Sequence, residues 1–385
     1  MSKVNFLDLV TIVGKSPEKY EGKKTYVSTG AVDCDHIDVE QLEEFSYSER
    51  PSRANLVADV DDILFAKMCA TKKALQLDSI TAKYIYSTGF YAVRAKENVI
   101  TPKLLLHLIS SDFFLSQKDL NCSGATQKAI TNAGLKNIFM NIPTFEKQFE
   151  IAVILDKVDN AIKLKQKQML YLEELVKSRF IEMFGDPVIN EKGWDTQSLA
   201  SICTSIVDCP HSTPKYTNEN TGFMCIRTSI VKKNRILWDD IEYISEKEYC
   251  ERIKRKQPKK GDIVYTREGA ILGVAAIIDR DCKVALGQRS MLISTDSNKC
   301  LPEFLSIAMN FDTFLNKVVS GTSGSASPHI NVCDIKAFKI MSPPIELQEQ
   351  FAAFVKQTDK SKLAIQKGLN KLEILKKSLM QQYFG

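Results

Sequence analysis

Two stretches of the chain carry apolar residues at helical spacing and contain no proline. The first follows Ile142-Pro143, runs for about 40 residues without proline or glycine, and is followed by Gly185. Its apolar residues recur at steps of three, four or seven: Leu155, Val158, Ile162, Met169, Leu172, Val176 and Met183. This spacing predicts a long amphipathic helix that Gly185 ends.

A second segment of the same kind follows Pro343-Pro344 and reaches Gly385, with Gly368 inside it at a cost of about 1 kcal/mol relative to alanine. Its apolar residues are Phe351, Phe354, Ile365, Leu369, Leu372, Leu375, Leu379 and Tyr383. Each stripe is too narrow for a helix that is buried all round, so a partner helix is expected. The two helices most simply bury their stripes against each other.

The segments before each long helix mix strand and helix patterns. Short β-branched runs such as GDIVYTREGA, AAIID and CKVALGQRSMLISTD predict strands, and TPKLLLHLISSDFFLSQ and LPEFLSIAMNFDTFLNKV predict amphipathic helices. Both globular parts are therefore predicted to be α+β. The expected boundaries are 1–142 and 185–342 for the globular parts, and 143–184 and 343–385 for the helices.

An internal repeat organises the whole chain. Residues 123–185 align without a gap on residues 323–385, an offset of 200, with about 18 identities in 63 positions. Asp62-Ile63 and Asp262-Ile263 extend the same offset further back, although the correspondence is poor between about 70 and 100. The chain consists of two copies of one unit.

Composition and charge narrow the class of protein only slightly. The 385 residues are 44% hydrophobic and 26% charged, with a net charge of +5, which weakly favours a phosphate-bearing partner. With no apolar leader and no membrane-length apolar run, a cytoplasmic protein is expected. The ten cysteines are scattered without a C-x-x-C pair, which favours reduced, mostly buried thiols over a disulfide framework or a zinc site.

Three short motifs suggest catalytic chemistry, and each has a simpler interpretation. Gly14-Lys15-Ser16 resembles the end of a phosphate loop, but Leu9 stands where the leading glycine is required. Asp33-Cys34-Asp35-His36 gathers metal-ligand types on neighbouring residues, which point to opposite faces of a strand. Ser342-Pro343-Pro344-Ile345 lacks the aromatic of an adenine methyltransferase loop and fits a helix start. No catalytic residue and no metal site is predicted.

The repeated segments resemble the two conserved regions of type I restriction–modification specificity subunits. The resemblance rests on IPTFEKQFEIAVILDKVDNAI and SPPIELQEQFAAFVKQTDKS, whose shared P-x-x-E-x-Q residues are Pro143, Glu146, Gln148, Pro343, Glu346 and Gln348. CSGATQKAITN (122–132) and GTSGSASPHIN (321–331) look like the ends of target-recognition domains. GWDTQSLASI (193–202) looks like the start of the second one, whereas the first opens without the tryptophan seen at 194.

The resemblance implies a fold, a function and partners. The fold would be two similar α+β target-recognition domains joined by two long antiparallel helices, a coiled coil, in a pseudo-twofold repeat. Each domain would read one half of a bipartite asymmetric site in double-stranded DNA, and the helices would set the spacer. Two modification subunits would supply S-adenosylmethionine-dependent adenine methylation, and restriction subunits ATP- and Mg²⁺-dependent translocation and cleavage. This chain would bind no cofactor, would not associate with a membrane and would have no catalytic activity of its own.

Candidate DNA contacts follow from the chemistry of phosphates and base edges. Arginine pairs with guanine, glutamine or asparagine with adenine, and lysine with phosphates. The stretch 251–260 holds six basic residues in ten. In the second copy the candidates are His211, Ser212, Thr213, Lys215, Tyr216, Arg227, Lys254, Arg255, Lys256, Arg267, Gln288, Arg289, Ser323 and Ser325. In the first copy they are Lys67, Lys72, Lys73, Gln127 and Lys128. For each one, a solvated surface residue is the competing interpretation.

Two other functions remain open at this point. One is an adenine-specific DNA methyltransferase with a degenerate catalytic loop, and the other is a coiled-coil scaffold that binds no nucleic acid. Methyl transfer by the purified chain alone would support only the methyltransferase.

Overall fold

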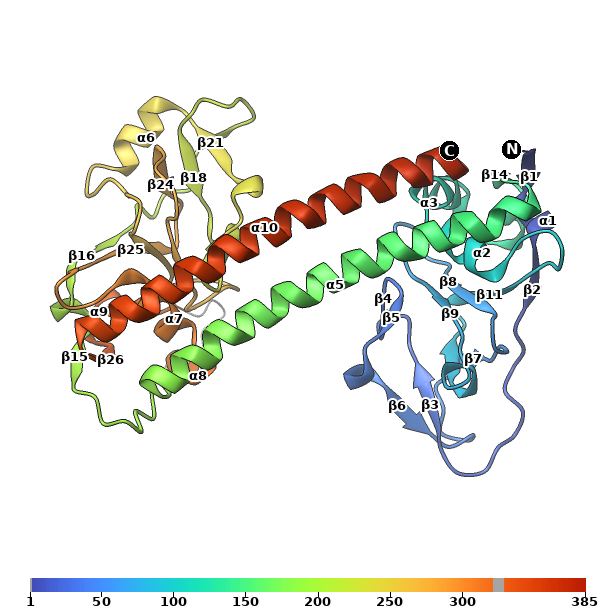
Figure 1. Ribbon diagram of the computed structural model, residues 1–385, viewed down its shortest axis with the longest axis horizontal. Coiled ribbons are helices and arrows are strands. Elements are labelled where there is room, and N and C mark those ends of the chain that lie inside the picture. Colours follow the sequence, from blue (N-terminus) through green and yellow to red (C-terminus); the bar gives the residue numbers. More distant parts are fainter. Residues whose placement is uncertain (1, 321–328) are drawn as a thin grey trace. The chain divides into compact units, whose positions relative to one another are not determined.

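The computed structural model describes residues 2–320 and 329–385 (Figure 1). The chain folds as two compact units: unit 1 comprises residues 1–166 together with 366–385, and unit 2 comprises residues 167–365. The boundaries between the units fall inside the two long helices, so each helix contributes one half to each unit. None of the helices in the described ranges is long and apolar enough to cross a membrane.

Each unit contains a four-stranded antiparallel sheet of the same order. In unit 1 the order is β2 (Val10–Val13), β11 (Phe90–Ala95), β8 (Ile63–Ala66) and β9 (Ala74–Gln76). In unit 2 it is β16 (Cys203–Asp208), β25 (Ser290–Thr295), β22 (Ile263–Thr266) and β23 (Ala275–Ile277). The shared order includes the stretch near 70–100, where the sequence alone shows little correspondence.

The central strand of this sheet is buried on both faces because its side chains enter two different cores. Along β8, Ile63 and Phe65 join the core beneath the helices, while Leu64 and Ala66 join the core beneath the second sheet. In unit 2, Tyr265 and Val264 divide in the same way. Alternation of side chains across a strand therefore places one apolar run between two layers.

In the second sheet, three strands of unit 1 have equivalents in unit 2. The fourth strand lies at one edge of the sheet in unit 1 and at the opposite edge in unit 2. Its order is β6 (Glu43–Phe45), β3 (Lys24–Val27), β10 (Ile85–Ser87) and β7 (Ala54–Leu56) in unit 1. In unit 2 it is β17 (Tyr216–Thr217), β21 (Glu242–Ile244), β18 (Met224–Ile226) and β24 (Val284–Leu286). The parallel pairs β3–β10 and β18–β24 are equivalent. The extra strand joins β10 in unit 1 and β21 in unit 2, so the repeat has diverged at this sheet.

Short helices and hairpins complete each unit. A helix pair covers the first sheet: α2 (Pro102–Ile109) with α3 (Asp112–Leu120), and α7 (Pro302–Asn310) with α8 (Asp312–Ser320). The side chains of Thr101 and Ser111 cap α2 and α3 by accepting backbone N–H groups. The remaining elements of unit 1 are β1 (Ser2–Asn5), α1 (Phe6–Leu9), β4 (Val32–Asp33), β5 (His36–Ile37), β12 (Cys122–Ser123), β13 (Ala129–Ile130), α4 (Asn132–Leu135) and β14 (Phe139–Ile142), with 3₁₀ turns at Val39–Gln41 and Thr81–Lys83. Those of unit 2 are β15 (Thr196–Ser198), β19 (Val231–Lys232), β20 (Arg235–Ile236), α6 (Glu246–Arg252), α9 (Val332–Ala337) and β26 (Lys339–Met341), with 3₁₀ turns at Leu199–Ser201, Thr228–Ile230 and Trp238–Asp240.

The two predicted long helices are confirmed as α5 (Phe145–Phe184) and α10 (Ile345–Phe384), each 40 residues and about 60 Å long. Gly185 follows α5 with φ +79°, a left-handed C-terminal residue, whereas Gly368 lies within α10. The helix segments run antiparallel within each unit. In unit 1, Lys376 forms an ion pair with Asp159 at 2.5 Å, and Gly368 lies beside Lys165.

The apolar stripe of α10 differs in part from its prediction. Leu375, which was assigned to the stripe, is 45% exposed, whereas Met380 and Phe384 are buried in the core of unit 1. In unit 2, Phe180 and Phe184 of α5 pack edge to face against Phe351 of α10. The ends of the helices are therefore anchored in the globular cores, and the predicted α+β class with antiparallel helices is confirmed.

A buried glutamine explains the repeated P-x-x-E-x-Q motif. Gln148 is fully buried; its Oε1 accepts the Thr101 N–H at 2.9 Å, and its Nε2 donates to the carbonyls of Val99 (2.8 Å) and Pro143 (3.4 Å). In unit 2, Gln348 makes the corresponding three hydrogen bonds, to the groups at positions 301, 299 and 343. One side chain thus joins the start of each long helix to the segment that leads into the preceding helix pair.

Candidate nucleic-acid interface

In unit 2, four segments that are distant in sequence meet at Arg267, directly after β22. The Arg267 N–H donates to the Arg289 carbonyl at 3.1 Å, and the Ile330 N–H donates to the Arg267 carbonyl at 2.9 Å. The Cys209 N–H donates to the Ser290 carbonyl and brings the loop after β16 to the same place. We call these segments, residues 208–213, 266–268, 287–289 and 329–330, the unit 2 rim.

The Arg267 side chain organises this rim from within. It is only 7% exposed, and its Nε and Nη2 donate to the two carboxylate oxygens of Asp208 at 3.0 and 3.3 Å. Asp208 also pairs with Nε2 of His211 at 3.0 Å, and that imidazole is exposed. The predicted DNA-contact residue Arg267 therefore has its donors occupied by protein groups and presents His211 to solvent.

The turn between β24 and β25 carries the exposed polar side chains of the rim. Arg289 is half exposed, and its Nε lies 3.7 Å from Oε1 of Glu268. Its φ is +73°, a region that costs a non-glycine residue about 1–2 kcal/mol. Gln288 Nε2 lies 3.5 Å from the exposed Thr213 hydroxyl. Strained backbone of this kind is concentrated at binding sites, where it holds a side chain in a required direction.

Next to this turn, an arginine and a tyrosine from the second sheet lie together. Arg227 Nη1 pairs with Glu242 Oε1 at 2.9 Å, and its guanidinium lies 5.8 Å from the Tyr216 ring centroid. Burial raises the pKa of Tyr216, so the phenol stays protonated. Among the described residues, buried Arg227 Nε and Glu242 Oε2 have no hydrogen-bond partner.

The basic run 251–260 divides into inward and outward cations. Arg252 is buried and donates to the Ser212 carbonyl at 2.7 Å, so it supports the loop that also presents the exposed Lys215. Lys256 donates to the hydroxyls of Ser205 and Ser294 and is half-buried. The exposed members of the run are Lys254, Arg255, Lys259 and Lys260, of which Lys254 pairs with Glu251 and Arg255 donates to the Asp208 carbonyl.

Unit 1 repeats the backbone of this rim at an offset of 200 residues. The Lys67 N–H donates to the Gly89 carbonyl at 2.9 Å, and the Ile130 N–H donates to the Lys67 carbonyl at 2.8 Å. The isolated bridge between Met68 and Ala129 matches the one between Glu268 and His329. We call residues 67–73, 88–89 and 127–130 the unit 1 rim. The two rims share a backbone frame and differ in side chains.

Three of the predicted cations of unit 1, Lys67, Lys72 and Lys73, lie at or beside this rim and have protein partners. Lys67 donates to the Thr88 carbonyl at 2.9 Å and lies 4.5 Å from the Tyr91 ring centroid, and burial lowers its pKa. Lys72 pairs with Asp112 at 3.0 Å, and Lys73 donates to the Thr29 carbonyl at 2.7 Å. Gln127 and Lys128 are exposed. Ser323 and Ser325 lie outside the described residues.

Sequence reasoning missed the residues that support both rims from below. Asp208 could have been noticed, because it precedes His211 by three residues, and Arg252 follows Glu248 at the i,i+4 spacing of a helical ion pair. Lys118 gave no signal. It is 1% exposed and donates to the carbonyls of Met68 (2.9 Å) and Thr71 (2.8 Å) beneath the unit 1 rim.

The three motifs set aside in the sequence have structural roles. Lys15 pairs through its backbone with Val57, so Gly14-Lys15-Ser16 extends a strand. Asp33 lies opposite His36 in the β4–β5 hairpin. Pro343-Pro344 lie directly before α10, as predicted. Among the cysteines, Cys209, Cys225 and Cys300 are buried but Cys34, Cys250 and Cys333 are exposed, so the expectation of mostly buried thiols is wrong.

Comparison with known proteins gives consistent matches. The family model described as the type I restriction modification DNA specificity domain matches residues 18–174 and again 191–374. The chain is 25% identical over 260 residues to the type I restriction enzyme MjaVIII specificity subunit of Methanocaldococcus jannaschii, a match that covers 64% of this chain and 61% of that protein. It is 24% identical to the MjaIX specificity subunit of the same organism, over 76% of this chain and 70% of that protein. The crystal structure of a type I restriction-modification system S subunit from M. genitalium has the same fold, with a TM-score of 0.56, 14% identity, and coverage of 100% of this chain and 96% of that one.

Proposed function

The chain belongs to the family of type I restriction–modification DNA specificity domains, and from this membership we propose that it supplies DNA sequence recognition to a type I restriction–modification complex. Its curated relatives are named specificity subunits, which are not catalysts. The matches span 61% and 70% of the lengths of those two relatives, so the activity of the whole assembly and its partners are part of the proposal.

The observation that carries the proposal is the repeated rim. Two rims with one backbone frame can each approach a DNA groove in the same manner, because the hydrogen bonds that shape them recur at an offset of 200 residues. Their side chains differ: Gly89 stands in unit 1 where the half-exposed Arg289 stands in unit 2, and Lys67 stands where the buried Arg267 and Asp208 hold the exposed His211. Equivalent frames with different side chains would read two different half-sites, which is a bipartite and asymmetric target.

The long helices suit a spacing role in this proposal. Each is a continuous run of 40 residues that contributes to the core of both units. A helix rises about 1.5 Å per residue and DNA about 3.4 Å per base pair, so helix length and spacer length are related by a fixed ratio. We propose that α5 and α10 determine how many base pairs separate the half-sites.

The exposed faces of the same helices suit the partner subunits. Large apolar side chains lie open to solvent on α5 and α10, where a protein partner would bury them: Leu164 (57% exposed), Leu170 (61%), Tyr171 (60%), Leu363 (58%) and Ile374 (70%). We propose that two modification subunits dock there and carry the S-adenosylmethionine site. Restriction subunits would bring ATP- and Mg²⁺-dependent activity to the same complex.

Selection from a random double-stranded DNA library tests the proposal. The chain, purified with its modification subunits, is expected to enrich one split sequence and to methylate adenine within it. The same chain alone is expected to transfer no methyl group from labelled S-adenosylmethionine. Methyl transfer by the chain alone would support the methyltransferase interpretation, and a complex that enriches no sequence would support a scaffold without nucleic acid.

A further inference from the structure

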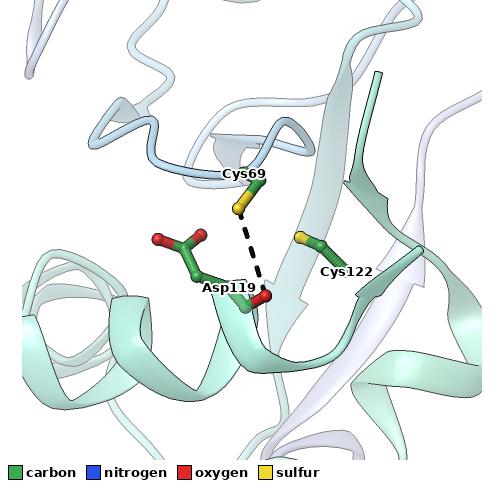
Figure 2. Close-up of side chains that lie close together, drawn as sticks. All are labelled: Cys69, Asp119 and Cys122. Carbon is green, nitrogen blue, oxygen red and sulfur yellow. Dashed lines mark hydrogen bonds between the residues drawn. The ribbon is translucent and has the colours of Figure 1, made fainter. Parts of the chain in front are cut away.

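Two cysteines and an aspartate converge beneath the unit 1 rim. Cys69 lies in the loop after β8, Asp119 in the last turn of α3, and Cys122 in β12 (Figure 2). Both thiol sulfurs and a carboxylate oxygen lie within 4.8 Å of one another, and all three residues are partly buried. Within residues 2–320 and 329–385, no other cluster of three or more such side chains meets this spacing.

The local backbone holds these donors in place. Oδ1 of Asp119 accepts the Ala70 N–H at 3.0 Å, which leaves Oδ2 for another partner. The Cys69 sulfur lies 4.0 Å from the Asp119 carbonyl, and the Cys122 sulfur lies 3.9 Å from the Lys67 carbonyl. Two thiolates and one carboxylate are a donor set that zinc prefers, with one coordination position open to water.

We propose that Cys69, Asp119 and Cys122 bind one soft divalent cation of the zinc class. Binding breaks two S–H bonds, releases two protons and forms two metal–sulfur bonds, while the metal and the sulfurs keep their oxidation states. The buried Lys118 ammonium lies 3.7 Å from Oδ1 of Asp119. Two thiolates and a carboxylate carry three negative charges, which a divalent ion and Lys118 balance.

Because of where the site lies, a bound ion would tie down part of the unit 1 rim. Cys69 lies within the segment 67–73 that carries Lys67, Lys72 and Lys73, and its N–H donates to the Lys128 carbonyl at 2.9 Å. A bound ion would join this segment to the strand that begins at Cys122. Unit 2 has Gly269, Val319 and Thr322 at the positions 200 residues later, so its sequence supplies none of these ligands. The metal site would therefore be present in unit 1 only. This proposal does not depend on the DNA-binding proposal.

The test measures zinc binding to the reduced full-length chain in competition with a chromophoric chelator. We expect one tightly bound ion per chain, and binding at least about tenfold weaker in Cys122→Ser and in Asp119→Asn. Cys250→Ser and Cys333→Ser change exposed thiols elsewhere and should leave the affinity unchanged. With Co²⁺ as the probe, wild type should show thiolate-to-metal absorption that Cys122→Ser reduces.

Hydrogen exchange of the wild-type chain gives a second measurement that does not need a folded variant. Added zinc should slow amide exchange in residues 67–73 and 119–123, and leave residues 266–273 unaffected. A reduced wild-type chain that binds zinc no better than Cys122→Ser, or slows exchange nowhere in those segments, overturns the proposal. So does equal loss of binding in Cys250→Ser. If the reduced chain binds no zinc but Cys69 and Cys122 form a disulfide on exposure to peroxide, the pair is a redox site and the metal proposal is wrong.

Discussion

Replacing Gln148 by leucine should destabilise unit 1 by an amount that its hydrogen bonds define. The substitution introduces an apolar side chain of similar size and leaves three buried backbone groups without partners: the Thr101 N–H and the carbonyls of Val99 and Pro143. A buried polar group left unpaired costs about 1–3 kcal/mol, and the 3.4 Å contact to Pro143 contributes least. We therefore expect the free energy of unfolding to fall by about 3–5 kcal/mol.

The two tryptophans allow this loss to be assigned to one unit. Trp194 and Trp238 both lie in unit 2, so tryptophan fluorescence reports on that unit, while circular dichroism reports on both. In urea, Gln148→Leu should lower the midpoint of the unit 1 transition by about 1–2 M and leave the tryptophan transition in place. Gln348→Leu should shift the tryptophan transition by a similar amount.

Exposed glutamines on the same helices provide the matched controls. Gln166→Leu on α5 and Gln357→Leu on α10 change the same side chain where it is open to solvent, and both should alter stability by less than about 0.5 kcal/mol. A loss below about 1 kcal/mol for Gln148→Leu would refute the reasoning, because it would mean that water or a small shift satisfies the three backbone groups.

Three further predictions concern DNA binding. Arg289→Ala and Arg289→Gly should each cost about 1–3 kcal/mol of specific binding and relax one base position. Because φ at position 289 is +73°, the glycine variant should be up to about 1 kcal/mol more stable than the alanine variant. Equal stability of the two variants in thermal melts would contradict the strain. Lys254→Ala and Arg255→Ala should each reduce the salt slope of DNA binding by about 0.9, measured by fluorescence anisotropy across salt concentrations. Lys256→Ala loses hydrogen bonds to two serines, so it should lower the stability of the protein instead. An unchanged slope for the first two variants would mean that Lys254 and Arg255 are solvated cations only. Four residues inserted after Lys165 add about 6 Å to α5 and should lengthen the recognised spacer by one or two base pairs, measured by methylation mapping; a changed base within a half-site would refute the separation of reading from spacing.

The long helices and the α+β class could be predicted because both rest on periodic patterns. The apolar steps in α5, and the offset of 200 residues, are visible without any knowledge of distant contacts. The error in α10 has a physical cause. Near its end the burial comes from the core of unit 1, so Met380 and Phe384 are buried while Leu375 faces solvent. The spacing of apolar residues along a helix predicts its contact with a partner helix. It cannot predict burial in a core that other parts of the chain form.

The rims could be predicted only by residue type. Arg267 and Arg289 are both arginines beside strand ends, but the first is 7% exposed and held by Asp208, and the second is half exposed. The basic run divides because α6 ends at Arg252 and the chain then turns, which sends Lys256 inward. The cluster of Cys69, Asp119 and Cys122 is formed by segments about 50 residues apart, so spacing in the sequence gave no sign of it.

The division of unit 1 into two stretches has a consequence for how the chain matures on the ribosome. Residues 1–166 emerge first, but their core includes Met380 and Phe384, which are translated about 200 residues later. At about 5–20 residues per second this delay is roughly 10–40 s, during which the continuous unit 2 is completed. The half of the protein that is made first must therefore be the last to close, and until then it carries an apolar surface that a chaperone could bind.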